Sequence, residues 1–348
     1  MPRFPVQPLV DLAAQVLASL GSRAADAHIV AEHLVESNLA GHDSHGLIRL
    51  PQYAAAIQDG QVHPTAEIEI VRETSTTALL DAHFAWGQVA VRQAMSLAVK
   101  KAKEHGMAAV GVRQAYHVGR IGVYLLEAVK EGLIGQAYCN GHGMRRAAPW
   151  GGTESRLATN PFAVAVPTRG APIVADFATT TVAEGKVRLA QAKGEAIPDS
   201  WVMDADGRGT TDPSVLYNGG TLLPLGGREG HKGYCLSIAV DLLAGMLTGA
   251  GAGFLRMEYG NGVLLQVVDP SAFGELEEFY DRIDEYVAYL KDSRLRDGVE
   301  EIQLPGDPER KSTARRQREG IEVDADTWQK ISDLAAVANL TLPTPLVD

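Results

Sequence analysis

Cysteine is scarce in this sequence, and its scarcity argues against two kinds of scaffold. The 348 residues include two cysteines, Cys139 and Cys235, which lie beside apolar residues and form no spaced pair. A disulfide framework or a thiolate zinc site is therefore not expected, and a reducing compartment fits this composition.

Basic charge is also in short supply. Lys and Arg number 32 against 43 Asp and Glu, so the formal net charge is −11 at pH 7. Because a phosphate backbone demands a basic face, nucleic-acid binding is not expected.

Long apolar runs are missing as well. A membrane-spanning helix needs about 20 consecutive apolar residues, and the sequence has no such run. The N-terminal MPRFPVQPLVDLAAQ contains prolines and an acid where a signal peptide needs an unbroken apolar stretch. We therefore expect a cytoplasmic protein that does not enter the membrane.

The common nucleotide-binding motifs are also lacking. GHGMRR (141–146) and GRGTTD (207–212) lack the third glycine of GxGxxG, and GGREGHKGY lacks the spacing of a P-loop. A Rossmann or P-loop nucleotide site is therefore not predicted.

What the sequence does contain is an alternation of helices and strands. Apolar residues at helical spacing predict helices over 8–20, 24–40, 87–105, 121–131, 181–193, 231–251, 275–292 and 324–340. Alternating or β-branched segments predict two strands within 67–82 and further strands within 108–113, 133–140, 156–168, 172–178, 200–203 and 262–270. This order indicates an α/β or mixed α+β architecture. The nearly all-apolar helix over 231–251 is expected to be deeply buried or to lie at a subunit interface.

The most distinctive stretch is GHDSHGLIRLPQY, residues 41–53. If it begins a helix near Gly46, with Asp43 or Ser44 as cap, then His45, Arg49 and Tyr53 project from one face at i, i+4 and i+8. An imidazole, a guanidinium and a phenol suit a small acid whose reacting carbon adjoins its carboxylate. Two other readings stay open: a metal site using His42, Asp43 and His45, and a capped helix whose histidines are structural.

Four further features carry possible chemistry. His117 follows a buried-looking strand, where ligands bind in α/β proteins, although a structural histidine is the alternative. A glycine-rich turn brings His231 and Lys232 to the start of a helix. This turn is either a phosphate-binding site or an ordinary loop that leads into the helix. Asp176 ends an apolar strand, where it could orient a histidine, bind a ribose or cap a helix. The basic segment 310–318 could contact a phosphate or form a solvated helix.

Several of these stretches are shared with one enzyme family. GHDSHGLIRLPQY, HVGRIG, APWGG, ATNPFAVAVPT, DFATTT, IPDSWVMDADGRGTTDP and LPLGGREGHKGYCLSIAVDLLAGMLTGA cover nearly the whole chain in the family's order. The chain resembles the malate/L-lactate/ureidoglycolate dehydrogenases, which bind nicotinamide nucleotides without a Rossmann fold. DSHGLIRLPQY, FAWGQVA and HVGRIG are most similar to the hydroxycarboxylate dehydrogenase subgroup.

This resemblance implies a fold and an assembly. It implies a non-Rossmann nicotinamide-nucleotide-binding domain with a mixed sheet, over residues 81–274, and an interwoven helical domain. The helical domain is expected to combine residues 1–80 with 275–348, to contribute to the substrate site and to form a homodimer. NAD or NADP is the implied cofactor, and a 2-oxo or 2-hydroxy acid is the implied substrate.

The resemblance also implies roles for individual residues. His117 matches the catalytic histidine, and His45, preceded by Ser44, matches a proton relay with Asp176 as its orienting carboxylate. Arg49 matches the substrate-carboxylate clamp, with Tyr53 beside it and Thr159 near the nicotinamide. The matching cofactor-contacting positions are Asn140, Gly141, Asn160, Asp176, Phe177, Ala178, Lys232, Gly306 and Asp307.

These residues leave more than one function open. The main expectation is hydride transfer between NAD(P)H and C2 of a 2-oxo acid. A cyclic-imine reductase acting on a substrate such as piperideine-2-carboxylate is the alternative within the same class. A nucleotide-binding protein without catalysis and a metal-dependent hydrolase are the alternatives from other classes.

Overall fold

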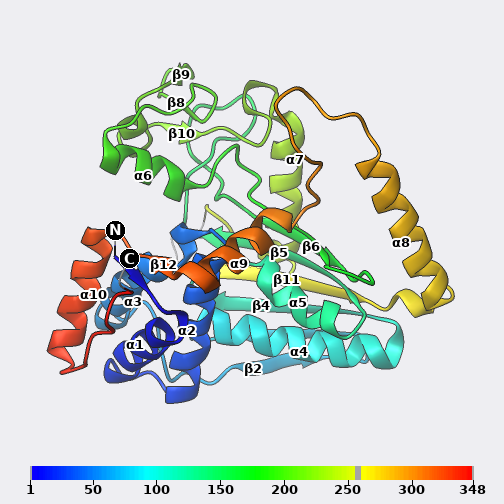
Figure 1. Cartoon of the computed structure of the whole chain (residues 1–348), viewed down its shortest axis with the longest axis horizontal. Helices are drawn as coiled ribbons and strands as arrows, with labels where there is room; N and C mark the ends of the chain where they lie inside the picture. Colours follow the sequence, from blue (N-terminus) through cyan, green and yellow to red (C-terminus); the bar gives the residue numbers. More distant parts are fainter. Residues whose placement is uncertain (1, 255–259, 347–348) are drawn as a thin grey trace.

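A mixed sheet forms the centre of the molecule, seen in the computed structural model, which describes residues 2–254 and 260–346 (Figure 1). Within that part of the chain the sheet has seven strands, in the order β2-β3-β4-β11-β5-β6-β7. Their bounds are β2 Glu69–Glu73, β3 Thr77–Asp81, β4 Met107–Ala115, β5 Ile134–His142, β6 Phe162–Val166, β7 Ile173–Phe177 and β11 Gly260–Val268. Strand β3 pairs parallel with β4, and the other neighbours pair antiparallel.

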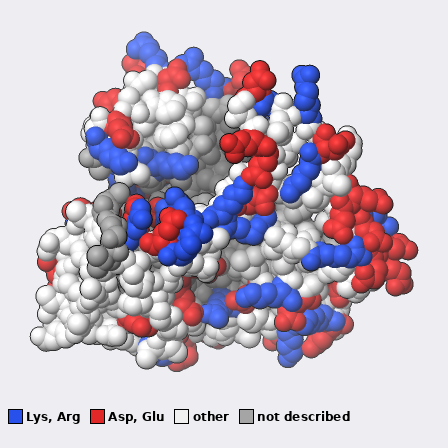
Figure 2. Space-filling model, viewed as in Figure 1, with Lys and Arg blue, Asp and Glu red and all other residues white. Residues whose placement is uncertain are grey.

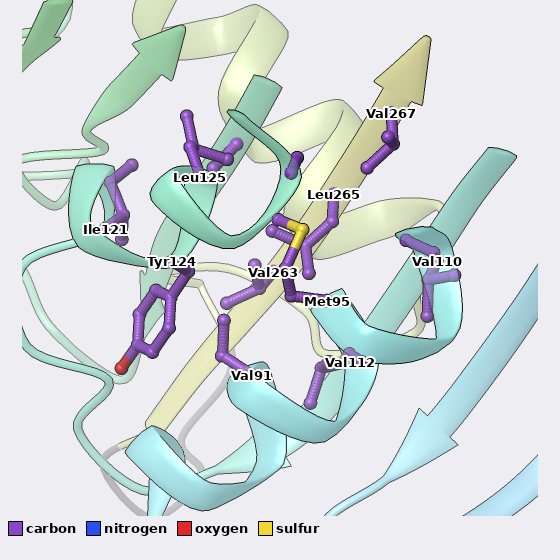
Figure 3. Close-up of a cluster of buried hydrophobic side chains, with 14 of the residues drawn as sticks. Val91, Met95, Val110, Val112, Ile121, Tyr124, Leu125, Val263, Leu265 and Val267 are labelled. Carbon is purple, nitrogen blue, oxygen red and sulfur yellow. The ribbon is translucent and has the colours of Figure 1, made fainter. Parts of the chain in front are cut away.

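Helices cover both faces of this sheet. Helices α4 (Gly87–His105) and α5 (Gly122–Lys130) lie on one face, where their apolar side chains meet those of β4 and β11 in the main core (Figure 3). On the other face lies α7 (His231–Val240), which continues as the π-helical segment η5 (Asp241–Met246). A Cβ added to Gly262 would lie 2.2 Å from the carbonyl oxygen of Ala244, so glycine lets η5 approach the sheet.

The two ends of the chain meet in a separate helical core. Helices α1 (Val6–Ser19), α2 (Ala24–Leu39), α3 (Leu50–Gln58) and α10 (Ala325–Val337) pack around it, beside the pairing of β1 (Arg3–Phe4) with β12 (Ile321–Glu322). Trp86 and Tyr116 from the sheet domain also belong to this core. The two regions are therefore interwoven, and β2 and most of β3 belong to the sheet although they precede residue 81.

A third cluster forms a lobe beside the sheet. It contains α6 (Glu184–Lys193), the short turns η3 (Pro213–Tyr217) and η4 (Gly227–Glu229), and the small sheet of β8 (Val202–Met203), β9 (Gly209–Thr210) and β10 (Thr221–Leu222). In Figure 2 the surface is hollowed between this lobe and the body, next to basic side chains of α9 (Asp307–Glu319). Acidic side chains gather over α8 (Leu276–Lys291).

Most of the expected elements are confirmed, with two corrections. The helix predicted over 231–251 is α-helical only to Val240, and it is not deeply buried, because Leu247 is 67% exposed. The helix expected from Gly46 begins at Leu50 instead. No helix among the described residues is both long and apolar enough to cross a membrane.

Candidate active site

Most of the predicted site residues meet at one edge of the sheet. Strands β4, β5 and β7 run in the same direction, so their carboxyl ends share an edge with the amino end of β6. His117 follows β4, Asn140 and Gly141 lie near the end of β5, and Asp176 and Phe177 end β7. Thr159 and Asn160 precede β6 and Ala178 follows β7. Ligands bind at such edges in α/β proteins.

His117 is held at this edge by a residue of the helical region. Its Nδ1 lies 2.6 Å from the hydroxyl of Tyr53 on α3. His117 is 7% exposed and Tyr53 is fully buried. The ring of His45 stacks on that of His117, with centroids 5.5 Å apart and planes 3° apart. The structure therefore brings together three of the residues predicted to act on substrate.

These residues come from three short elements and not from a single helix. His45 ends the 3-10 turn η1 (Asp43–His45), Arg49 ends η2 (Leu47–Arg49), and Tyr53 lies on α3. Pro51 stands in the first turn of α3, the position that tolerates its missing N–H. The prediction that His45, Arg49 and Tyr53 share one face of a single helix is thus wrong, although the three side chains still lie near His117.

Neighbouring groups hold the rest of this segment in place. Asn38 on α2 accepts a hydrogen bond from the backbone N–H of Leu47 at 2.8 Å and donates to Asp43 at 2.6 Å. Gly46 lies so close to Asn38 that an added Cβ would be 2.2 Å from its side-chain oxygen. Neither Asp43 nor Ser44 caps a helix here. Asp43 instead pairs with Arg316 of α9 at 2.5 Å.

Arg49 is oriented by two hydrogen bonds. Its Nε donates to the carbonyl oxygen of Ser44, and its Nη1 donates to Oε1 of Gln52, each at 2.7 Å. Ser44 also touches the third lobe, because a Cβ on Gly185 of α6 would lie 2.6 Å from the Cβ of Ser44. The guanidinium and the hydroxyl therefore lie where the lobe approaches the body.

Both stacked histidines are neutral at pH 7. Burial, with contributions from Arg49 and His45, lowers the pKa of His117 well below 6.5. Burial and the same arginine lower the pKa of His45 to about 3, and its Nδ1 has no hydrogen-bond partner among the described residues. Anything that neutralises Arg49 would allow the imidazoles to gain protons more readily.

Asp176 does not contact His45. Its Oδ2 accepts a hydrogen bond from the backbone N–H of Gly122 at 2.8 Å and lies 3.5 Å from Nε of Arg120. Burial raises the pKa of Asp176, while Arg120 and Gly122 oppose that rise. The expected relay from Asp176 to His45 therefore stays a prediction, and the partner that the structure provides is Arg120.

The predicted cofactor residues include two fully buried amides. Asn140 donates to the carbonyl oxygen of Gly251 at 2.6 Å and to Asp241 at 3.1 Å. Asn160 donates to Ser237 at 3.1 Å, while its Oδ1 is buried without a hydrogen-bond partner among the described residues. An unpartnered acceptor suits the amide group of a nicotinamide ring. Beside it, a Cβ on Gly141 would lie 3.0 Å from the Cβ of Ala158.

The other predicted substrate and cofactor residues differ in their contacts and exposure. Thr159 accepts from the backbone N–H of Thr179 at 2.9 Å, and Phe177 is 37% exposed. Lys232 is exposed in the first turn of α7. Gly306 lies against Val174 of β7, and Asp307 accepts from the backbone N–H of Leu304 at 2.7 Å. The last two therefore lie beside the strand that carries Asp176.

The geometry gives little support to a metal site formed by His42, Asp43 and His45. His42 pairs with Glu309 at 3.0 Å, and Asp43 pairs with Arg316. The part of the chain that the structure describes contains no group of three or more His, Cys, Asp or Glu side chains arranged to hold a metal ion.

The sequence reasoning missed three buried polar residues of the site. Gln88 bonds Tyr53, Arg120 pairs with Asp176, and Asn261 accepts from the backbone N–H of Val118 at 3.0 Å. A polar residue between glycine and apolar neighbours was the available signal, in GQVA and in GNGV. Its partners could not be read from the sequence.

Comparisons with known proteins identify the family of this chain. The malate/L-lactate dehydrogenase family model matches residues 4–332. A malate dehydrogenase of Pyrococcus abyssi is 36% identical, with 96% of this chain and 94% of that protein covered. Hydroxycarboxylate dehydrogenase B of Escherichia coli is 34% identical, with 96% and 93% covered. The crystal structure of malate dehydrogenase from Entamoeba histolytica matches with a TM-score of 0.94 and 29% identity, covering 98% of this chain and 99% of that one. The chain thus belongs to the malate/L-lactate dehydrogenase family and is an oxidoreductase of the nicotinamide-dependent kind.

Proposed function

We propose that this protein interconverts 2-oxo acids and 2-hydroxy acids, with NADH or NADPH as the second substrate. The observation that carries the proposal is the placement of His117 and His45, stacked at 5.5 Å, beside the oriented guanidinium of Arg49. A proton donor next to an anion-binding group suits a carbonyl that adjoins a carboxylate. Relatives named malate, lactate, sulfolactate and hydroxycarboxylate dehydrogenase support this acid class.

In this proposal Arg49 binds the substrate carboxylate. Its bonds to Ser44 and Gln52 hold the planar guanidinium, which suits bidentate binding of a carboxylate. With the carboxylate fixed, the orientation of the adjoining carbonyl is restricted, which favours reaction on one face. Tyr53 and Thr159 complete the expected substrate pocket.

His117 supplies the proton. Arg49 lowers the pKa of His117, so a bound carboxylate that neutralises Arg49 makes protonation of the ring easier. The imidazolium then gives its Nε2 proton to the carbonyl oxygen as negative charge grows there, and the neutral ring takes the proton back in the reverse reaction. His45, with Ser44 before it, is the second candidate for this role.

The buried amides and glycine suit a nicotinamide nucleotide. When bound, the reduced nucleotide supplies the hydride that converts the carbonyl carbon into a carbinol. Asn160 and Thr159 would hold the nicotinamide end, and Asn140, Gly141, Asp176, Phe177 and Ala178 would line the rest of the site at the sheet edge. Lys232, Gly306 and Asp307 would hold the more distant part of the nucleotide.

The test is oxidation of NADH and of NADPH by the purified protein against a panel of 2-oxo acids and one cyclic imine. Turnover of a 2-oxo acid with either nucleotide supports the proposal and sorts cofactor preference. Turnover of the imine alone would show that the protein is a cyclic-imine reductase and not a 2-oxo acid reductase. Nucleotide binding without turnover on any compound would contradict catalysis.

We also propose that the protein is a homodimer and that α7 with η5 lies at its interface. Leu242, Leu247 and Phe254 are 55%, 67% and 68% exposed. Leu242 and Phe254 line an apolar cavity of about 340 Å³ with Ile238 and Met246, and Leu247 follows Met246 in the chain. Large exposed apolar side chains that cluster in this way are typical of protein contacts. Light scattering on the wild type and on Leu247→Glu tests this, with a monomeric wild type as the contradicting result.

A further inference from the structure

A chain of two buried hydrogen bonds ends at His117. The amide nitrogen Nε2 of Gln88 lies 2.8 Å from the hydroxyl of Tyr53, and that hydroxyl lies 2.6 Å from Nδ1 of His117. Gln88 and Tyr53 are fully buried, and His117 is 7% exposed. Three separate elements, α4, α3 and the loop after β4, therefore contribute one residue each.

Gln88 is placed by the close approach of its helix to the loop that carries His117. It is the second residue of α4, directly after Gly87. A Cβ on Gly87 would lie 2.2 Å from the carbonyl oxygen of Tyr116 and 2.7 Å from that of His117. Only glycine allows this contact, so the helix start and the histidine loop are locked together.

The protons in this chain have two arrangements. With its NH₂ group toward Tyr53, Gln88 donates to the hydroxyl, whose own hydrogen then points to Nδ1 of His117. With its oxygen toward Tyr53, Gln88 accepts the hydroxyl hydrogen, and the hydroxyl oxygen can then accept from a protonated Nδ1. The two ends of the amide have the same shape, so both orientations fit the site.

The two arrangements favour different states of the imidazole. A neutral ring with hydrogen only on Nε2 matches the first, because Nδ1 is then an acceptor. An imidazolium, or a neutral ring with hydrogen on Nδ1, matches the second. In the structure the NH₂ group faces Tyr53, and Oε1 of Gln88 is buried without a hydrogen-bond partner among the described residues.

The charged groups around His117 do not favour a cationic ring. Arg49 from η2, His45 from η1 and His33 from α2 each lower the pKa of His117, as does its burial. Tyr53 from α3 and Gln88 from α4 are the neighbours that form the hydrogen-bonded chain. An acceptor at the end of that chain would stabilise the charged ring against its burial and the positive charge of Arg49.

We propose that Gln88 is a positioning residue: through Tyr53, its amide decides whether Nδ1 of His117 accepts or donates a hydrogen bond, and so sets the protonation of the proton donor. This inference rests on the role proposed for His117 above. Gln88 does not touch the substrate in this proposal. It acts only through the hydroxyl of Tyr53.

The test compares two substitutions of nearly unchanged length. Gln88→Met removes both hydrogen-bonding ends, and Gln88→Glu places a permanent acceptor at the end of the chain. A shorter side chain is unsuitable, because Gln88, His33 and Tyr124 line a cavity of about 310 Å³ that would then open to the hydrogen-bonded chain. Gln93→Met and Gln93→Glu, at an exposed position of the same helix, are matched controls.

The first measurement is the pH dependence of kcat/KM for reduction of the best 2-oxo acid. Gln88→Glu should move the alkaline limb to higher pH by about one unit or more, and Gln88→Met should move it to lower pH. The Gln93 variants should keep the wild-type profile. In a Tyr53→Phe background the Gln88→Glu shift should vanish. If it persists there, or if neither Gln88 variant shifts the profile, the proposal is overturned.

The second measurement does not depend on turnover. Long-range ¹H–¹⁵N spectra of protein labelled with ¹⁵N-histidine report which ring nitrogen of His117 carries hydrogen, with His117→Asn providing the assignment. At neutral pH the wild type should carry it on Nε2, and Gln88→Glu should move it to Nδ1. An identical tautomer in both folded proteins overturns the inference, even if no substrate has been found. Absence of turnover by the wild type would instead count against the proposed function.

Discussion

The imidazole rings of His45 and His117 lie face to face, with centroids 5.5 Å apart and planes 3° apart. Two rings this close do not both carry a positive charge without strong repulsion, and His45 accordingly lowers the pKa of His117. At most one of the two rings therefore carries a positive charge at a time. The hydrogen bond between Tyr53 and His117 distinguishes His117 as the ring whose orientation is fixed.

Replacing the two histidines should have unequal effects. We expect His117→Ala to lower kcat by roughly 10²–10⁴, the scale of a lost general acid. His45→Ala should lower it less, because the orienting bond from Tyr53 goes to His117. Steady-state kinetics on folded, nucleotide-binding variants measure this. Unchanged turnover in His117→Ala, or a larger loss in His45→Ala, would contradict the assignment.

Arg49→Ala should act mainly on substrate binding. Loss of a charge-assisted contact to the carboxylate should raise KM for the oxo acid by about 10- to 100-fold, and Arg49→Lys should recover part of it. Because Arg49 lowers the pKa of His117, its removal should also move the pH–rate profile to higher pH. A change in nucleotide affinity alone would show that Arg49 is not the clamp.

His33 should make the protein sensitive to acid. Burial, assisted by Arg120, lowers the pKa of His33 from 6.5 to about 3. The unfolded chain therefore binds this proton near pH 6.5, and the folded chain only near pH 3. The stability associated with the neutral ring is complete above pH 6.5 and is lost as pH falls toward 3, by about 1.4 kcal/mol per pH unit.

The substitution His33→Gln checks this pH dependence. The amide oxygen can still accept the hydrogen bond that the backbone N–H of Arg120 gives to His33 at 3.0 Å. Between pH 5.5 and 4.5 the variant should lose about 1.4 kcal/mol less unfolding free energy than the wild type in urea titrations. His28→Gln, on the exposed side of the same helix, is the control. Equal losses in wild type and His33→Gln would refute the prediction.

Gly185→Ala should disturb the contact between the third lobe and the body. The added Cβ would lie 2.6 Å from the Cβ of Ser44, so α6 or η1 must move. We expect a loss of about 1–3 kcal/mol in stability, typical of overpacking, and a higher KM for the oxo acid. Thermal unfolding and kinetics together measure both effects. A variant with wild-type stability and KM would show that this contact is not needed.

Local patterns determined most of the elements. Apolar periodicity located α1, α2, α4 and α5, and β-branched runs located β4, β5 and β11, because each repeat reflects a face buried in a core. The meeting of both chain ends in one helical region was expected from the family resemblance. The residues expected to act were also identified by type and motif, since His117, Arg49 and Tyr53 carry chemistry that few other side chains can supply.

Tertiary structure decided how those residues are joined. Pro51 and the close packing of Gly46 against Asn38 break the expected helix into η1, η2 and α3, which the local pattern of 41–53 did not reveal. Asp176 is partnered by Arg120 because β7 and the loop after β4 are neighbours only in the folded sheet. In the sequence Gln88 is one of several polar residues of α4. Its bond to Tyr53 spans 35 positions of the sequence, and such a contact depends on packing between elements and not on any local repeat.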